Sequence, residues 1–202
     1  LVYKSLDGIN IKPFYNAEDI QDSIKTPSPK NWNICERLYV VSAEKSNKRA
    51  NEILKKGTES LWFIIPNEEI SIESLLKGIA LEKTIIYFSF NFFSVDYFKR
   101  LREFLKGKQH QIFLQFDIVG NLARSGNWFH NLQKDHEILE SIFTNSKDFK
   151  SVISIDTTLY QNSGANIPQQ LAYALAHVNE YLNHLQENPN FEKFQPQFLI
   201  AS

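Results

Sequence analysis

One stretch decides the fold of this chain: Ile155-Asp156-Thr157-Thr158-Leu159-Tyr160-Gln161-Asn162-Ser163-Gly164-Ala165. It is typical of the end of a buried strand, a polar turn with one glycine, and the start of a helix. In parallel α/β folds this junction is where ligands bind and catalytic residues lie. Because the stretch lacks an evident set of acid, base and nucleophile, we expect a barrel-type protein that has kept its scaffold and lost its catalysis.

The helix that follows has the clearest pattern in the chain. Its apolar residues recur at spacings of three and four: Ile167, Leu171, Leu175, Val178, Leu182 and Leu185. Asn166 is placed to cap this helix, Gln169 to complete a capping box, and Pro168 to occupy the first turn.

Short continuous apolar runs recur upstream and downstream, as expected for strands covered on both faces. The predicted strands are 38–41, 61–65, 84–88, 111–116, 152–155 and 198–201. The predicted helices between them are 46–56, 71–80, 94–106 and 132–143, in addition to the one that begins at Ile167.

This alternation predicts a parallel sheet with right-handed crossovers. Two architectures fit this pattern: an open doubly wound sheet or a (β/α)8 TIM-type barrel. No G-x-G-x-x-G or Walker A sequence follows any strand, which weakens the nucleotide-binding sheet. We therefore expect the N-terminal portion of a barrel, with about six of the eight strands, in a domain spanning 31–202. Residues 1–30, whose last six residues include Pro27 and Pro29, are predicted to be an extended arm or linker for subunit contact.

Composition excludes several classes of protein. The 202 residues are 43% hydrophobic and have a net charge of −1, so nothing favours binding to nucleic acid or to an anionic membrane surface. No apolar run approaches the roughly 18–20 residues that span a bilayer, and no signal peptide is visible. A single cysteine, Cys35, excludes an internal disulfide and a zinc finger. The absence of methionine, together with a start at Leu1, suggests a piece of a longer chain, and the expected location is cytoplasmic.

Asp117 and Asp156 each end a predicted strand. They could form a carboxylate pair for acid–base chemistry, or each could cap the turn that follows it. Arg124 could bind an anion or could be an ordinary surface arginine.

The remaining candidates favour structural roles. The five histidines form no His-x-x-x-His pair, so no metal site is predicted. His177 and His184 are expected on a solvated helix face. Residues 128–130, Trp-Phe-His, are expected to anchor a loop, and Cys35 is expected to be a small packed residue.

Three ordered segments resemble the methylmalonyl-CoA mutase family, and specifically its small subunit. They are 6–20, 31–57 and 161–176, which include Asn31-Trp32-Asn33-Ile34 and Gln161-Asn162-Ser163-Gly164-Ala165, and the ordered set is more specific than any single motif. The resemblance implies a barrel that binds acyl-CoA along its axis, with adenosylcobalamin against its carboxyl end, held by a separate domain. In two-subunit members the large subunit is catalytic, the small one is a non-catalytic companion, and their N-terminal arms wrap each other.

Departures from the family pattern fall in the pocket. The chain has Thr158 and Leu159 where catalytic members carry a tyrosine and a histidine, shortly before the turn that begins at Gln161. Cys35 replaces an arginine, and 66–70 replaces the loop after the second strand. Gln115 and Asp117 match the family's Gln-Asn-Asp, and its substrate-binding arginine falls at Ser125, beside Arg124. The cobalamin motif Asp-x-His-x-x-Gly is absent.

We therefore expect the small subunit of an adenosylcobalamin-dependent mutase, non-catalytic itself and paired as a heterodimer with a catalytic large subunit. No catalytic, metal or cofactor-binding residue is predicted, and the cofactor is expected only in the holoenzyme. The predicted vestigial pocket is Gln115, Asp117, Arg124, Thr158, Leu159 and Gln161. The alternative is an independently active barrel enzyme that acts on a small anionic or acyl-CoA substrate.

Overall fold

The computed structural model describes residues 1–19, 28 and 31–200. The main strands are β3 (Cys35–Tyr39), β4 (Ser60–Ile65), β5 (Ile85–Phe90), β6 (Gln111–Phe116), β7 (Ser151–Asp156) and β8 (Gln197–Leu199). The α-helices are α1 (Ala43–Leu54), α2 (Ile72–Leu76), α3 (Val95–Leu105), α4 (Ile118–Ser125), α5 (Leu132–Thr144), α6 (Thr158–Asn162) and α7 (Ile167–Leu185). Two short 3-10 helices lie at Ala17–Asp19 and Phe191–Lys193.

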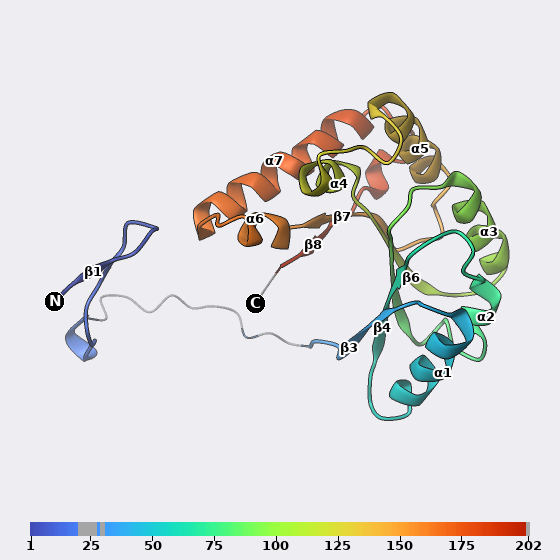
Figure 1. The fold of residues 1–202 in the computed structure, drawn as a ribbon, viewed down its shortest axis with the longest axis horizontal. Helices are drawn as coiled ribbons and strands as arrows, with labels where there is room; N and C mark the ends of the chain where they lie inside the picture. The colour runs from blue at the N-terminus through green and yellow to red at the C-terminus, as the bar shows by residue number, and fades with distance from the viewer. Residues whose placement is uncertain (20–27, 29–30, 201–202) are drawn as a thin grey trace.

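The six main strands form one parallel arc in sequence order, β3-β4-β5-β6-β7-β8. A doubly wound sheet reverses its strand order at a switch point, and this sheet never does. Each right-handed crossover therefore places its helix on the same side, and Figure 1 shows α1, α3, α5 and α7 around the outside of the curve. The arc is a partial (β/α)8 TIM-type barrel, and the prediction of a barrel portion with six parallel strands is confirmed.

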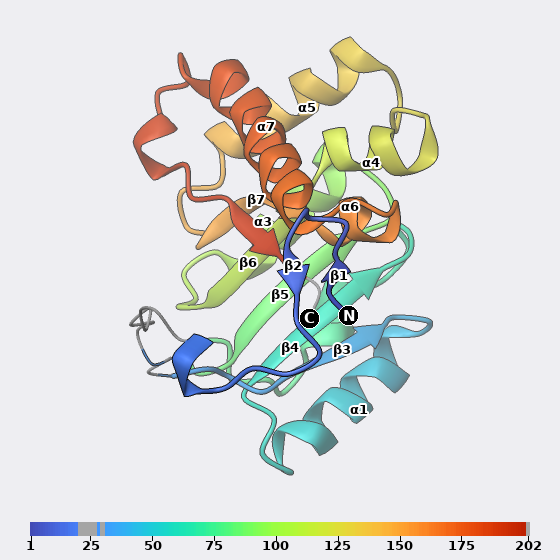
Figure 2. The same ribbon diagram turned by 90° about the vertical axis from the view of Figure 1, so that its left-hand side faces the viewer.

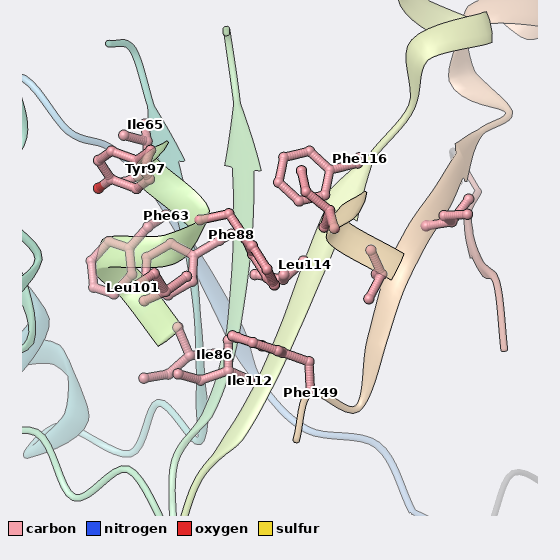
Figure 3. Close-up of a cluster of buried hydrophobic side chains, with 14 of the residues drawn as sticks. Phe63, Ile65, Ile86, Phe88, Tyr97, Leu101, Ile112, Leu114, Phe116 and Phe149 are labelled. Carbon is pink, nitrogen blue, oxygen red and sulfur yellow. The ribbon is translucent and has the colours of Figure 1, made fainter. Parts of the chain in front are cut away.

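The core lies between the convex face of this arc and the surrounding helices. Alternate residues of neighbouring strands share this face, and Phe63, Phe88 and Leu114 are 2% exposed or less. Figure 3 shows Phe63 and Phe88 beside Leu101 of α3, and Leu114 farther along the same face of the sheet. Burying one such side chain contributes about 1.5–3 kcal/mol, so this layer sets the sheet's position against the helices.

Helix starts follow the capping residues in the sequence. Ser42, Ser71, Ser94 and Asn131 each accept a hydrogen bond from the backbone N–H three residues on. At α7 the predicted capping box is confirmed: the Asn166 side chain accepts from the Gln169 N–H, and the Gln169 side chain accepts from the Asn166 N–H.

Two helices were not predicted. No helix is predicted between strand 111–116 and helix 132–143, but 118–125 forms α4, which ends at Gly126 with a φ of 75°. The polar turn after β7 contains α6, which is only five residues long. Both follow a strand directly, so neither has a separate apolar run to mark it.

The predicted apolar stripe of α7 is only partly buried. The buried residues are Ala174, His177, Val178, Tyr181 and Leu185. Ile167, Leu171 and Leu175 are 74%, 62% and 54% exposed, and we call these three residues the outer flank of α7. The core face of the helix is therefore rotated from the stripe that the spacing predicted.

The described part of the N-terminal arm is a small hairpin, β1 (Tyr3–Lys4) paired antiparallel with β2 (Asn10–Ile11). Figures 1 and 2 show it at the open side of the arc, on the side where α6 and one end of α7 lie. Its large side chains, such as Leu6 and Phe14, are exposed. The rest of the predicted arm, 20–27 and 29–30, lies outside the described residues. Within the described residues, no helix has the length and apolar character needed to cross a membrane.

Candidate functional site

The concave face of the arc carries the side chains that alternate with the core. Strand register aligns Arg37, Trp62, Tyr87 and Phe113 in one row across β3, β4, β5 and β6. The Tyr87 and Phe113 rings stack with centroids 5.0 Å apart. We call Trp62, Tyr87 and Phe113 the aromatic row.

A hollow of about 870 Å³ lies at the carboxyl ends of these strands. Its polar lining comes from Arg37, Ser89, Asn91, Gln115, Asp117, Asn121, Arg124, Ser154, Asp156 and Thr158. Of the predicted pocket, the hollow brings together Gln115, Asp117, Arg124 and Thr158, whereas Leu159 and Gln161 are not among its lining residues. That these residues are a vestigial substrate pocket stays a prediction.

Arg124 is tied to a carboxylate within this hollow. Its guanidinium donates to Asp156 at 2.8 Å, joining the end of α4 to the end of β7. The other oxygen of Asp156 accepts from the backbone N–H and the hydroxyl of Thr158. The interpretation of Asp156 as a residue that caps its own turn therefore agrees with the structure.

Asp117 is the centre of a buried hydrogen-bond network. Its Oδ1 accepts from the Gly120 N–H, from His177 Nε2 and from the Tyr181 hydroxyl, each at 2.8 Å. A carboxylate only accepts, so His177 Nε2 carries the proton; in the neutral ring Nδ1 then accepts from the Tyr160 hydroxyl at 2.9 Å. Burial, with the nearby Asp117 charge, raises the pKa of the Tyr181 phenol well above its ordinary value. The network locks α4, α6 and α7 onto β6.

The prediction that His177 lies on a solvated helix face is wrong. The residue is 3% exposed, because α7 packs this side chain between Asp117, 60 residues away, and Tyr160 of the preceding helix. His184 is partly buried beside Glu140, and its ring centroid lies 4.5 Å from that of His136. The alternation of polar and apolar residues along α7 gives no signal of either contact.

Two further expectations have different outcomes. The segment 128–130 is a packed loop anchor, as predicted: fully buried Asp135 accepts from the backbone N–H groups of Phe129 and His130 and contacts His130 Nδ1. Cys35 was expected to be packed, but it is exposed on β3 at the open edge of the arc. The neighbouring atoms of the sheet still partly shield its thiol from water, and this desolvation raises the pKa of the thiol above its ordinary value.

A second polar chain fixes the concave face. The indole of Trp62 donates to the Ser89 hydroxyl, which donates to Gln115 Oε1, each at 2.6 Å. The guanidinium carbon of Arg37 lies 4.8 Å from the Trp62 ring centroid. Sequence reasoning missed Arg37, Trp62 and Ser89; counting every second residue back from the strand ends would have placed them on this face.

The chemistry of the hollow is therefore limited. Both carboxylates hold internal donors, and within the described ranges no three His, Cys, Asp or Glu side chains are grouped so that they could hold a metal ion. The arc defines the class as a (β/α)-barrel protein, a class in which ligands bind at the carboxyl ends of the strands, where this hollow lies.

Comparison with known proteins gives the family. The family profile described as "Methylmalonyl-CoA mutase" matches residues 71–200, more than half of the chain. The chain belongs to the methylmalonyl-CoA mutase family, which confirms the resemblance. It is also similar to the "Methylmalonyl-CoA mutase small subunit" of Porphyromonas gingivalis, with 30% identity over 108 residues. That alignment covers 45% of this chain and 17% of the relative, so the chain spans only a small part of the relative's length.

Proposed function

We propose that this chain belongs to the non-catalytic small subunit of an adenosylcobalamin-dependent mutase that interconverts methylmalonyl-CoA and succinyl-CoA. It pairs with a catalytic large subunit, and the complex works in the cytoplasm. The printed name of the relative supports the small-subunit assignment. The observation that carries the proposal is the aromatic row on the concave face.

The aromatic row lies where the family resemblance implies a passage for acyl-CoA. In a barrel of eight strands, large inward-facing side chains can fill the interior. One layer of the described arc carries three such side chains, Trp62, Tyr87 and Phe113. The hydrogen bond from Trp62 to Ser89 and the stacking of Tyr87 on Phe113 hold these side chains in place. This arrangement supports a barrel that does not thread acyl-CoA along its axis.

The carboxyl end supports the same proposal. Leu159 puts a hydrocarbon side chain where the resemblance implies an imidazole that contacts substrate and cofactor. The nearby imidazole of His177 is buried and bonded to Asp117 and Tyr160. The described donors at this end therefore do not fit adenosylcobalamin, and we derive no catalytic step through it.

Co-expression with the catalytic large subunit of the same organism tests the proposal. We expect the full-length chain to co-purify with that subunit in a one-to-one complex, with cobalamin and mutase activity found in the complex and not in this chain alone. The result that would overturn the proposal is activity, with stoichiometric cobalamin, in the isolated full-length chain. Turnover of a small anionic substrate by that chain would favour an independent barrel enzyme instead.

A further inference from the structure

Arg37 differs from the chain's other four arginines. Each of those has an oxygen acceptor: Arg49 pairs with Glu36, Arg100 donates to the Glu68 carbonyl, Arg102 to Asn145 and Arg124 to Asp156. For Arg37, the described residues provide an aromatic contact, with Trp62, and no hydrogen bond or ion pair. An exposed guanidinium in a hollow thus keeps its N–H donors unused.

The guanidinium of Arg37 contacts a tryptophan that is itself held in place by hydrogen bonds. Trp62 is fixed by the hydrogen bonds that run through Ser89 to Gln115, and the guanidinium carbon of Arg37 lies over the indole, 4.8 Å from its centroid. A cation over the face of an aromatic ring is attracted to it without using its N–H groups as hydrogen-bond donors. This contact therefore leaves the donors of Arg37 available for a forked acceptor.

The carboxylates of the same hollow do not neutralise Arg37. Asp117 binds His177, and Asp156 binds Arg124. Arg37 is on β3, whereas Asp117 follows β6 and Asp156 ends β7, three and four strands away. Each carboxylate therefore already has its own donor, and among the described residues neither makes an ion pair with Arg37.

We propose that Arg37 anchors a small oxyanion, a carboxylate or a phosphate group, in the hollow at the carboxyl end of the arc. The two acceptor oxygens bind the guanidinium edge, and the rest of the ligand lies over Trp62 and towards Ser89. A hollow of about 870 Å³ is large enough for a complete small molecule, so this ligand needs no passage through the aromatic row. The site is separate from subunit pairing and from mutase activity.

Tryptophan fluorescence tests this proposal. The chain has three tryptophans, so Trp32→Phe combined with Trp128→Phe leaves Trp62 as the only indole. We expect succinate or inorganic phosphate, titrated into this full-length variant at constant ionic strength against sodium chloride, to change Trp62 emission saturably. Comparing the two titrations shows whether the anchor prefers a carboxylate or a phosphate.

Variants at Arg37 distinguish anion binding by this side chain from non-specific attraction of anions to positive charge. In the same background, Arg37→Gln is expected to weaken binding about tenfold or more, because charge-assisted hydrogen bonds are lost. Arg37→Lys should be intermediate, since it keeps the charge and loses the fork. Arg49→Gln is the matched control, because Arg49 pairs with Glu36, and it should bind like its parent. The proposal is overturned if neither anion differs from chloride, or if Arg37→Gln binds as tightly as its parent; circular dichroism checks that each variant is folded.

Discussion

The carboxylate of Asp117 and the imidazole of His177 are 60 residues apart in sequence and 2.8 Å apart in space. Both side chains are nearly inaccessible, with 11% and 1% of their surfaces exposed. The contact joins the start of α4 to the middle of α7, and it makes the carboxyl end of β6 a structural junction.

Removing His177 should destabilise the fold strongly. His177→Ala leaves Asp117 without one donor and Tyr160 without its acceptor, and losing buried hydrogen bonds of this kind costs about 2–4 kcal/mol. Asn179→Ala, at an exposed position of the same helix, should change stability by less than about 0.5 kcal/mol. Urea unfolding of both variants measures the difference, and equal midpoints would show that the network contributes nothing.

Asp135 lies outside the hollow, but its carboxylate should contribute strongly to the stability of the fold. Asp135→Ala leaves the backbone N–H groups of Phe129 and His130 without their acceptor, a loss of about 2–4 kcal/mol. Glu137→Ala, on the exposed face of α5, is the control and should lie within about 0.5 kcal/mol of the parent. Thermal unfolding distinguishes the two, and a small loss for Asp135→Ala would contradict the role of its carboxylate as the loop anchor.

The two partners of the Arg124–Asp156 ion pair should differ in their effect on stability. The Arg124 side chain is 51% exposed, so Arg124→Ala should cost less than about 1 kcal/mol. Asp156→Ala should cost about 1–2 kcal/mol more, because Asp156 also accepts two hydrogen bonds from Thr158. Unfolding by urea ranks the variants, and an equal loss for both would mean that the capping bonds are not formed.

Stability should fall as the pH is lowered from about 7 to 5. Burial lowers the pKa of His184 below its ordinary value, and His136 lowers it further, against the opposing effect of Glu140 and Glu180. The pKa of His110 is also lowered, first by burial. Below an unfolded pKa of about 6.5 the unfolded chain therefore binds protons that the folded chain does not, and folding stability is lost as the pH drops.

Replacing His184 isolates its share of this effect. His184→Gln should make the loss of stability between pH 7 and pH 5 smaller, whereas Asn183→Gln, at the exposed neighbouring position, should leave it unchanged. The measurement is urea unfolding at several pH values. A His184→Gln variant with the parent's pH dependence would contradict a lowered pKa for this imidazole.

Most of the fold could be predicted because local signals agree with it. Strands such as 111–116 are continuous apolar runs, and Asn166 with Gln169 marks the start of α7 without any tertiary information. α4 has capping residues, Asp117 at its start and Gly126 at its end, but it is short, contains Gly120 and follows a strand almost directly, so no apolar period marks it as a helix.

The site was harder to predict because its contacts are long-range. The burial of His177 depends on Asp117, and nothing within α7 indicates that partner. Arg37 and Trp62 face the concave side because side chains alternate along a strand. Trp62 lies within the apolar run 61–65 and Arg37 directly before the run 38–41, so neither run shows which residues face which side. Asp156 and Arg124 were both identified as candidates, and only the folded arc shows that they bind each other.

The outer flank of α7 has a consequence for handling the protein. No Asp, Glu, Lys or Arg occurs between Asp156 and Glu180, so Ile167, Leu171 and Leu175 sit in a segment without formal charge. Self-association of the protein through this flank would not depend on the concentration of sodium chloride, because there are no formal charges to screen. It would weaken when the temperature is lowered, since attraction between apolar surfaces weakens on cooling.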